Sequence, residues 1–307
     1  MAAAAAALAA CAGTPLSSQP WAQYAPMLYR VERDGRTCAW LFGTVHVGTE
    51  TLYPWPANIE RAWRASGRVA VEIDSARRWK ELVEAFRPHV NLPGGQTLDG
   101  LLPATLLSAV RRTFGWSDEE WLILRRRQPW WVANFRFGTD DDRQQGTERR
   151  WGIESTLLKR VATEERTLVE LESVADNVQG IAGGSLDEQC QQFALWFEDA
   201  RQRGQLLRDL LAAWRTGNEA TLAALKDRMW GDDRHLSSLR ARFFTERDRR
   251  MAARLIRAME RPAPAGDPRE APDAAPLFVA VGAFHLVGAD SLPPRLREAG
   301  FTVTRRT

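Results

Sequence analysis

The sequence has few of the residues that usually carry nucleophilic or redox chemistry. Only three cysteines occur in 307 residues, none in a Cys-x-x-Cys pair, and only three of the 42 basic residues are lysines. No Gly-x-Ser-x-Gly turn, phosphate-binding glycine loop or His-Glu-x-x-His helix is present. A serine or cysteine nucleophile is therefore unsupported. Cys38 and Cys190 could pair in an exported protein, but two isolated cysteines favour free buried thiols.

Long apolar runs and one-sided charge are also lacking. Beyond the N-terminus, no stretch approaches the roughly 18 apolar residues of a membrane span. Hydrophobic residues make up 44% of the chain and charged residues 26%, a balance typical of a globular protein with a sizeable core. The net charge is +3, and arginines lie beside acids, as in residues 240–257. Without a basic cluster interleaved with aromatics, a nucleic-acid partner is not expected.

Residues 1–26 differ in composition from the rest of the chain. Residues 1–10 are almost all alanine and end in Leu-Ala-Ala before Cys11, as in bacterial lipoprotein signals, where this cysteine carries the lipid. The segment lacks a positive start and is short for an apolar signal region of about 7–15 residues, so a misassigned start or an alanine tail are alternatives. Residues 12–26 read as a flexible tether. We expect an exported periplasmic or outer-membrane lipoprotein, associated with the membrane only through Cys11, with one domain over residues 27–307.

Each end of that domain has the pattern of a βαβ unit. Strand, helix and strand follow one another with a glycine after each helix, which predicts parallel strands and a right-handed crossover. The expected elements are residues 37–45, 57–66 and 69–73 at one end, and residues 277–282, 293–299 and 301–304 at the other.

The segment between these units, about residues 78–260, has mainly helical periodicity. Its expected helices are residues 81–90, 103–114, 117–126, 129–137, 148–163, 186–214, 219–229 and 236–260, with one strand at 167–172. The sequence thus predicts an α/β fold. A central mixed, mainly parallel sheet is built from the N- and C-terminal βαβ units and carries a large helical insert.

Two Gly-x-x-His segments, ending at His46 and His285, fall where the first strand of each unit ends. Ligands of open parallel sheets bind beyond the carboxyl ends of the strands. Glu72 lies late in an apolar strand, where a carboxylate needs a partner or a cation. Two imidazoles and a carboxylate predict a divalent-metal site formed by His46, Glu72 and His285. The alternative for Glu72 is a structural ion pair with an arginine.

Further polar residues could line the same site. Glu154 opens a helix, where it could act as a base or simply stabilise the helix end. Glu170 and Glu172 alternate in the third strand, and Glu172, at its end, is the better candidate. Arg247 could stabilise an anionic intermediate. His89 and His235 have no such context and are interpreted as surface or helix-end residues. Metal-assisted attack of water, with Glu72 or Glu154 as general base, is the chemistry expected here.

The chain resembles the TraB/PrgY/GumN family, to which the animal Tiki proteases are related. The resemblance runs from about Leu28 to Thr304. The segments that carry it are Leu-Phe-Gly-Thr-Val-His-Val-Gly at 41–48, Val-Glu-Ile-Asp at 71–74, Gly-Ile-Glu at 152–154, Leu-Glu-Ser at 171–173, Glu-Arg-Asp at 246–248 and Val-Gly-Ala-Phe-His-Leu-Val-Gly at 281–288. Asp248 stands where the family usually has asparagine, which leaves its role open.

The resemblance implies a fold akin to the erythromycin-esterase and ChaN-like group, with the two histidines, a strand glutamate and an arginine in the active site. It also implies a metal-dependent peptidase that uses manganese or cobalt, zinc being a third option, and a peptide or protein substrate. One alternative is a ChaN-like lipoprotein that holds haem or another small ligand without turning it over. Another is a metal-free hydrolase of the erythromycin-esterase type.

Overall fold

A computed structural model describes residues 24–136, 148–200, 203–230, 237–260 and 275–306. The predicted lipid attachment site Cys11, nearly all of the predicted signal and tether, and His235 lie outside these ranges. The two cysteines inside them, Cys38 and Cys190, are free; Cys38 is buried, as predicted, whereas Cys190 is only partly buried.

A six-stranded sheet has the strand order β4-β3-β5-β2-β1-β6. Its strands are β1 (Leu28–Arg33), β2 (Arg36–Thr44), β3 (Arg68–Val71), β4 (Leu168–Glu170), β5 (Leu277–Gly282) and β6 (Thr302–Arg306). The strands from β4 to β2 pair in parallel, whereas β1 is antiparallel to both β2 and β6. The mixed, mainly parallel sheet expected from the sequence is therefore confirmed.

The two βαβ units interleave in this sheet. The N-terminal unit joins β2 to β3 through α2 (Ala57–Ala65), and the C-terminal unit joins β5 to β6 through α16 (Leu292–Glu298). Strand β5 lies between β2 and β3, so the two strands of the N-terminal unit are not neighbours. This order brings the carboxyl ends of β2, β5 and β3 side by side.

Strand β1 was not predicted. Asp34 and Gly35 both have positive φ, 52° and 74°, and form the tight turn of a hairpin between β1 and β2. Because this strand ends in polar residues, its apolar character is weak in the sequence. It pairs with both β2 and β6 and so places the last strand of the chain in the sheet.

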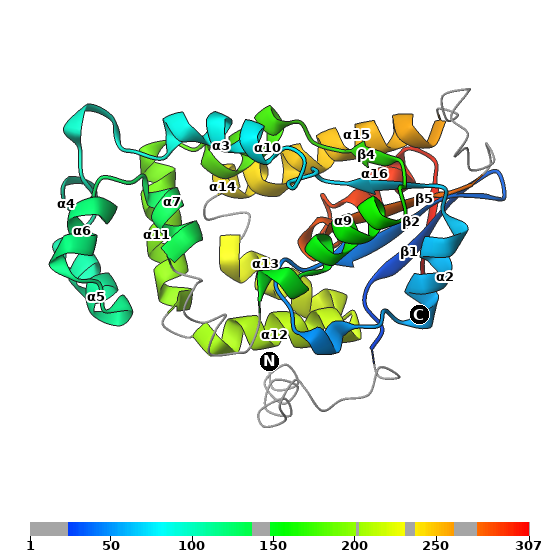
Figure 1. The fold of residues 1–307 in the computed structure, drawn as a ribbon, viewed down its shortest axis with the longest axis horizontal. Coiled ribbons are helices and arrows are strands. Elements are labelled where there is room, and N and C mark those ends of the chain that lie inside the picture. Colours follow the sequence, from blue (N-terminus) through cyan, green and yellow to red (C-terminus); the bar gives the residue numbers. More distant parts are fainter. Residues whose placement is uncertain (1–23, 137–147, 201–202, 231–236, 261–274, 307) are drawn as a thin grey trace.

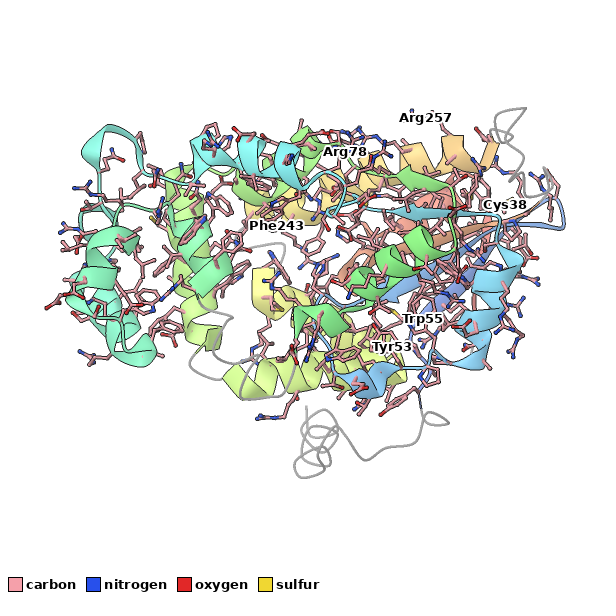
Figure 2. The ribbon with its side chains drawn as sticks, viewed as in Figure 1. Cys38, Tyr53, Trp55, Arg78, Phe243 and Arg257 are labelled. Atoms are coloured by element: carbon pink, nitrogen blue, oxygen red, sulfur yellow. The ribbon has the colours of Figure 1, made fainter. Side chains whose placement is uncertain are left out.

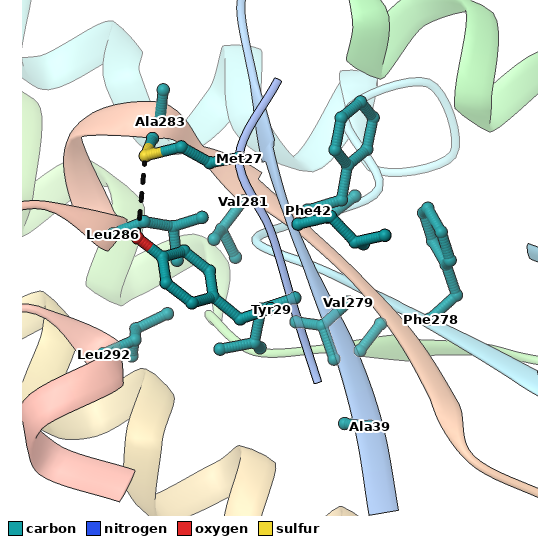
Figure 3. Close-up of a cluster of buried hydrophobic side chains, with 14 of the residues drawn as sticks. Met27, Tyr29, Ala39, Phe42, Phe278, Val279, Val281, Ala283, Leu286 and Leu292 are labelled. Atoms are coloured by element: carbon teal, nitrogen blue, oxygen red, sulfur yellow. Dashed lines mark hydrogen bonds between the residues drawn. The ribbon is translucent and has the colours of Figure 1, made fainter. Parts of the chain in front are cut away.

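Side chains on the two faces of the sheet form one large core (Figure 3). Val279 and Val281 of β5 project toward Tyr29 and Leu292, whereas Phe42 and Phe278 project the other way. On that second face, Phe278 stacks on Trp55 and meets Trp63 of α2 edge to face. Burial of these aromatic rings on one face and of aliphatic side chains on the other fixes the orientation of the strands.

Figure 1 shows the sheet at one end of the molecule and helices α4–α6 at the other. The helical segment contains α3 (Trp79–Phe86), α4 (Leu98–Leu101), α5 (Ala104–Phe114), α6 (Asp118–Leu124), α7 (Pro129–Arg136), α9 (Ile153–Thr163), α10 (Val174–Ala182), α11 (Leu186–Ala200), α12 (Arg203–Thr216), α13 (Glu219–Trp230), α14 (Ser237–Arg240) and α15 (Glu246–Glu260). Helices α4–α7 and α11 share a second apolar cluster, separate from the main core. Within the described ranges, no helix combines the length and apolar character that crossing a membrane requires.

Several predicted helices are divided in the structure. Residues 148–163 form the short 3-10 helix η6 (Arg149–Trp151) and α9, with Gly152 between them. Residues 186–214 contain α11 and α12, and the expected helix 236–260 contains α14, the π-helical turn η7 (Ala241–Thr245) and α15. Helix α10 was not predicted. Its start is set by a reciprocal Ser173–Asp176 capping box.

Candidate functional site

The predicted polar residues gather at the carboxyl end of the sheet. His46 lies two residues after β2, Glu72 one residue after β3, and His285 in the 3-10 turn η8 (Ala283–Leu286) that follows β5. Because β5 separates β2 from β3, the His285 turn lies between the His46 and Glu72 segments. The interleaved order therefore places two histidines and a carboxylate at adjacent strand ends.

His46 is paired with Glu154 in the first turn of α9. Its Nδ1 lies 3.2 Å from Oε1 of Glu154, which also accepts a hydrogen bond from the Thr44 hydroxyl. The Glu154 carboxylate, and more weakly Glu72, raise the pKa of His46. Water screens part of this attraction, because 72% of the His46 side chain is exposed. Most of the His46 side chain is therefore accessible from solvent.

The backbone holds the His46 loop against the start of α9. The amide of Ile153 donates to the carbonyl of Val45, and Gly48 and Glu148 exchange two backbone hydrogen bonds. A Cβ on Gly152 would lie only 2.2 Å from the carbonyl oxygen of His46. The close approach of the two chains therefore requires glycine at position 152. This contact explains why the predicted helix breaks there.

Glu72 is held from two sides. Its Oε1 accepts a 2.7 Å hydrogen bond from the amide of Gly282, and its Oε2 accepts a 2.9 Å bond from Nη2 of Arg247. Nε2 of His285 lies 3.7 Å from the same Oε1. Burial opposes the charge of this carboxylate, but His285 and Arg247 outweigh it and hold its pKa well below the usual value. Glu72 is therefore ionised in the folded protein.

Arg247 bridges two carboxylates in the interior. Its Nε and Nη2 bind the two oxygens of Glu172 at 2.6 and 2.8 Å, while Nη2 also reaches Glu72. Asn177 donates a further bond to Glu172. This two-point geometry is specific to the arginine fork. The predicted site residues Glu172 and Arg247 thus lie beside Glu72, but the guanidinium is engaged by carboxylates rather than free to meet a substrate anion.

Asp248 is the neighbour of His285, and its role could not be assigned from the sequence. The carboxylate of Asp248 has no exposed surface and binds Nδ1 of His285. The contact joins α15 to η8, 37 residues apart, so no local pattern indicates it. Its only sequence signal is its place next to Arg247 in Glu-Arg-Asp. A carboxylate at Nδ1 fixes the ring and leaves Nε2 as the nitrogen that faces Glu72.

The remaining predicted polar residues lie elsewhere. Glu170 binds Arg78 at 2.8 Å and accepts a bond from the amide of Asp74, so it is a structural ion pair. His89 ends the 3-10 turn η4 (Arg87–His89), as predicted for a helix-end residue. Figure 2 labels Arg78 beside α3. It also labels Tyr53, whose hydroxyl donates to the carbonyls of Trp151 and Gly152.

Histidine and carboxylate side chains of this kind are residue types that could bind a divalent metal. His46 and His285 each bind a carboxylate through Nδ1, an arrangement common around metal-bound imidazoles, and Nε2 of His285 also lies 3.7 Å from Oε1 of Glu72. Among the described residues, the buried atoms Oε2 of Glu154 and Oδ2 of Asp248 have no hydrogen-bond partner. In those same residues, however, no three His, Cys, Asp or Glu side chains are close enough to enclose an ion. The donors instead form two pairs, His46 with Glu154 and His285 with Glu72.

Comparison with known proteins identifies the family. The model of the TraB/PrgY/gumN family matches residues 27–305, nearly the whole chain and every strand of the sheet. No curated protein and no solved structure matched the chain.

Proposed function

Because the chain belongs to the TraB/PrgY/gumN family, we propose that it is a metal-dependent hydrolase that cleaves peptide bonds. One observation carries the proposal. Two histidines, each bound through Nδ1 to its own carboxylate, lie at neighbouring strand ends with the ionised Glu72. Paired imidazoles and carboxylates are suited to binding a divalent cation and to moving a proton from water.

In this proposal His46, Glu72 and His285 hold the cation, which is manganese, cobalt or zinc. When bound, the cation polarises a carbonyl and lowers the pKa of water. Glu154 lies beside His46 with one buried oxygen unpartnered among the described residues, which suits it to accept a proton. Glu172 binds Arg247, and Arg247 holds one oxygen of the Glu72 carboxylate. The other oxygen of Glu72 lies beside His285.

The test is metal analysis combined with activity on a peptide library. The purified protein is expected to bind about one divalent ion and to cleave peptides in a chelator-sensitive way. His46→Ala and His285→Ala should lose both properties while remaining folded. His89→Ala is the matched control, because His89 ends a helix away from the site. Full metal occupancy in both site variants would refute the proposal.

A metal-free hydrolase is the second candidate, and a specific observation favours it. Both oxygens of Glu72 already have partners, Gly282 and Arg247, so the folded chain satisfies this carboxylate without a cation. The His285–Asp248 pair could then activate water directly. Turnover that resists chelators and still depends on His285 would support this mechanism over the first. A Soret band on titration with haem, without turnover, would instead indicate the ChaN-like binding function.

Export and lipid attachment at Cys11 belong to the same proposal. They rest on the Leu-Ala-Ala-Cys sequence at residues 8–11. Cys11→Ser is expected to move the protein from the membrane fraction to the soluble fraction of the cell. Equal distribution of the two forms would rule out the lipid anchor and would leave the proposed chemistry unaffected.

A further inference from the structure

We propose that Lys226 is a positioning residue that fixes the turn carrying His285. The inference rests on the proposed function only in taking His285 as a site residue. Lys226 lies on α13, and its Nζ donates to the carbonyls of Phe284 and Val287 at 2.9 and 3.1 Å. These carbonyls flank His285 on both sides. One ammonium group thus holds the backbone on which the imidazole is mounted.

The same ammonium also orders a ring that packs on His285. Nζ lies 4.0 Å from the centre of the Phe244 ring, and this ring lies 5.4 Å from that of His285. A cation over an aromatic face is attracted to the negative face of the ring, and more strongly so when it is removed from water. Phe244 comes from the π-helical turn η7, where Arg242, Phe243 and Phe244 are all buried in succession. Lys226 therefore acts on His285 through the backbone on both flanks and through a neighbouring ring.

The burial of Lys226 is unusual for its residue type. Its exposed fraction is 3%, whereas the other two lysines of the chain, Lys80 and Lys159, are exposed. Burial lowers the pKa of Lys226 to about 8, and the charge of Asp248 opposes this change. The ammonium therefore sits in a buried environment together with the carboxylate that holds the His285 ring. Loss of the Lys226 charge would remove part of the positive charge around the Asp248 carboxylate, which also binds Nδ1 of His285.

The choice of lysine follows from the arrangement of the two carbonyls that it binds. A compact ammonium carries three donors at one point and can serve two carbonyls that face the same atom. A planar guanidinium is larger and spreads its donors over a fork. Arginine supplies nearly all the other positive charge of this chain, so a lysine at the one buried site behind His285 matches the shape required there.

Nuclear magnetic resonance of the histidine side chains tests this role without substrate or metal. The chain has four histidines, so a ¹⁵N-histidine spectrum can be assigned with His→Gln variants. The measurement uses metal-free full-length protein about two pH units below the pKa of Lys226, where the ammonium is charged. In the wild type, the Nδ1 proton of His285 should be protected from exchange by Asp248. Lys226→Met is expected to lose this protected signal while the His46 and His89 signals stay unchanged.

Lys159→Met is the matched control, because Lys159 is exposed on α9. It should leave all four histidine signals in place. An unchanged His285 signal in folded Lys226→Met would overturn the proposal. If Lys226→Met does not fold, the test uses the wild type. The Lys226 ammonium should then give an exchange-protected signal with a nuclear Overhauser effect to Phe244. If the ammonium signals exchange fast with water, the proposed role of Lys226 is overturned. A failure of metal-dependent hydrolysis would leave these signals unaffected, so the two proposals fail separately.

Discussion

The Nδ1 atom of His285 is bound to the carboxylate of Asp248, a side chain with no exposed surface. Asp248 comes from the first turn of α15, directly after Arg247, which binds Glu72 and Glu172. The first turn of α15 therefore positions three side chains of the site. Asp248 orients His285, and the preceding residue, Arg247, orients Glu72 and Glu172. This arrangement makes the beginning of α15 the part of the molecule on which the geometry of the site most depends.

Asp248→Ala is expected to weaken the site more than the fold. Residues that orient a metal-bound histidine typically contribute about 10–100-fold to metal affinity or activity. Asp248→Asn keeps an acceptor for Nδ1 and should cost less. Metal affinity, peptide cleavage and the melting temperature would be measured together. Asp187→Ala, at an exposed position in α11, is the control. Equal losses in Asp248→Ala and Asp187→Ala would show that the contact has no functional role.

Arg247→Met is expected to lower the free energy of unfolding by about 3–5 kcal/mol, because it leaves Glu72 and Glu172 buried without their partner. Arg247→Lys keeps the charge but loses the fork, so it should fall between Met and the wild type. Urea denaturation provides the measurement.

The neighbouring Arg249 is exposed, and Arg249→Met should change stability by less than about 0.5 kcal/mol. The double variant Arg247→Met, Glu172→Gln should lose less stability than the sum of the losses in the two single variants, because it removes both members of the pair. Strict additivity would contradict the direct coupling that the structure shows.

The sequence predicted which site residues lie at strand ends better than it predicted the contacts between those residues. His46, Glu72 and His285 could be placed because each follows an apolar strand of a βαβ pattern, and parallel strands end at the same edge. The interleaving of the units could not be predicted, because strand order depends on packing of elements far apart in the chain. Strand β1 was missed because its hairpin partner, rather than its own apolar pattern, defines it.

Asp248 and Lys226 show the same limit for the site. Their partners lie 37 and about 60 residues away, so their roles depend on how α15 and α13 pack behind η8. The composition offered one signal, the rarity of lysine in an arginine-rich chain, but it did not indicate that Lys226 binds the turn that carries His285. In the structure Arg247 binds two protein carboxylates, and its expected role beside an anionic reaction intermediate stays a prediction.

Asp176 makes the stability of the protein depend on pH. It closes the capping box of α10 and binds Arg254 at 2.6 Å. Burial alone would raise its pKa, but bonds from Ser173 and Arg254 lower it from 3.8 to about 2. A lowered pKa in the folded state contributes stability above the unfolded value, and this contribution is lost as the pH falls toward the folded value.

Asp176→Asn should therefore be less stable than the wild type by about 2 kcal/mol near neutral pH, and the difference should shrink as the pH falls from 3.8 toward 2. Urea denaturation at a series of pH values measures it. Asp187→Asn, at an exposed position, is the control and should show only a small difference from the wild type. If the stability difference between Asp176→Asn and the wild type stayed constant down to the lowest pH, the charge of the Asp176 carboxylate would not contribute to stability.

Gly152→Ala tests whether the His46 loop depends on the close approach of two backbones. Gly152 has φ −60° and ψ 145°, a conformation open to alanine, so backbone strain is not the issue. The added Cβ would lie 2.2 Å from the carbonyl oxygen of His46, and that loop must move. Overpacking of this kind costs about 1–3 kcal/mol. The variant should lose stability, and the His46 resonances should shift because the pair with Glu154 is disturbed.

Gly100 in α4 has open space around its Cβ position, so Gly100→Ala should be neutral or stabilising by up to about 1 kcal/mol. If the two variants were equally stable and the His46 signals were unchanged, the start of α9 would not be what fixes the His46 loop.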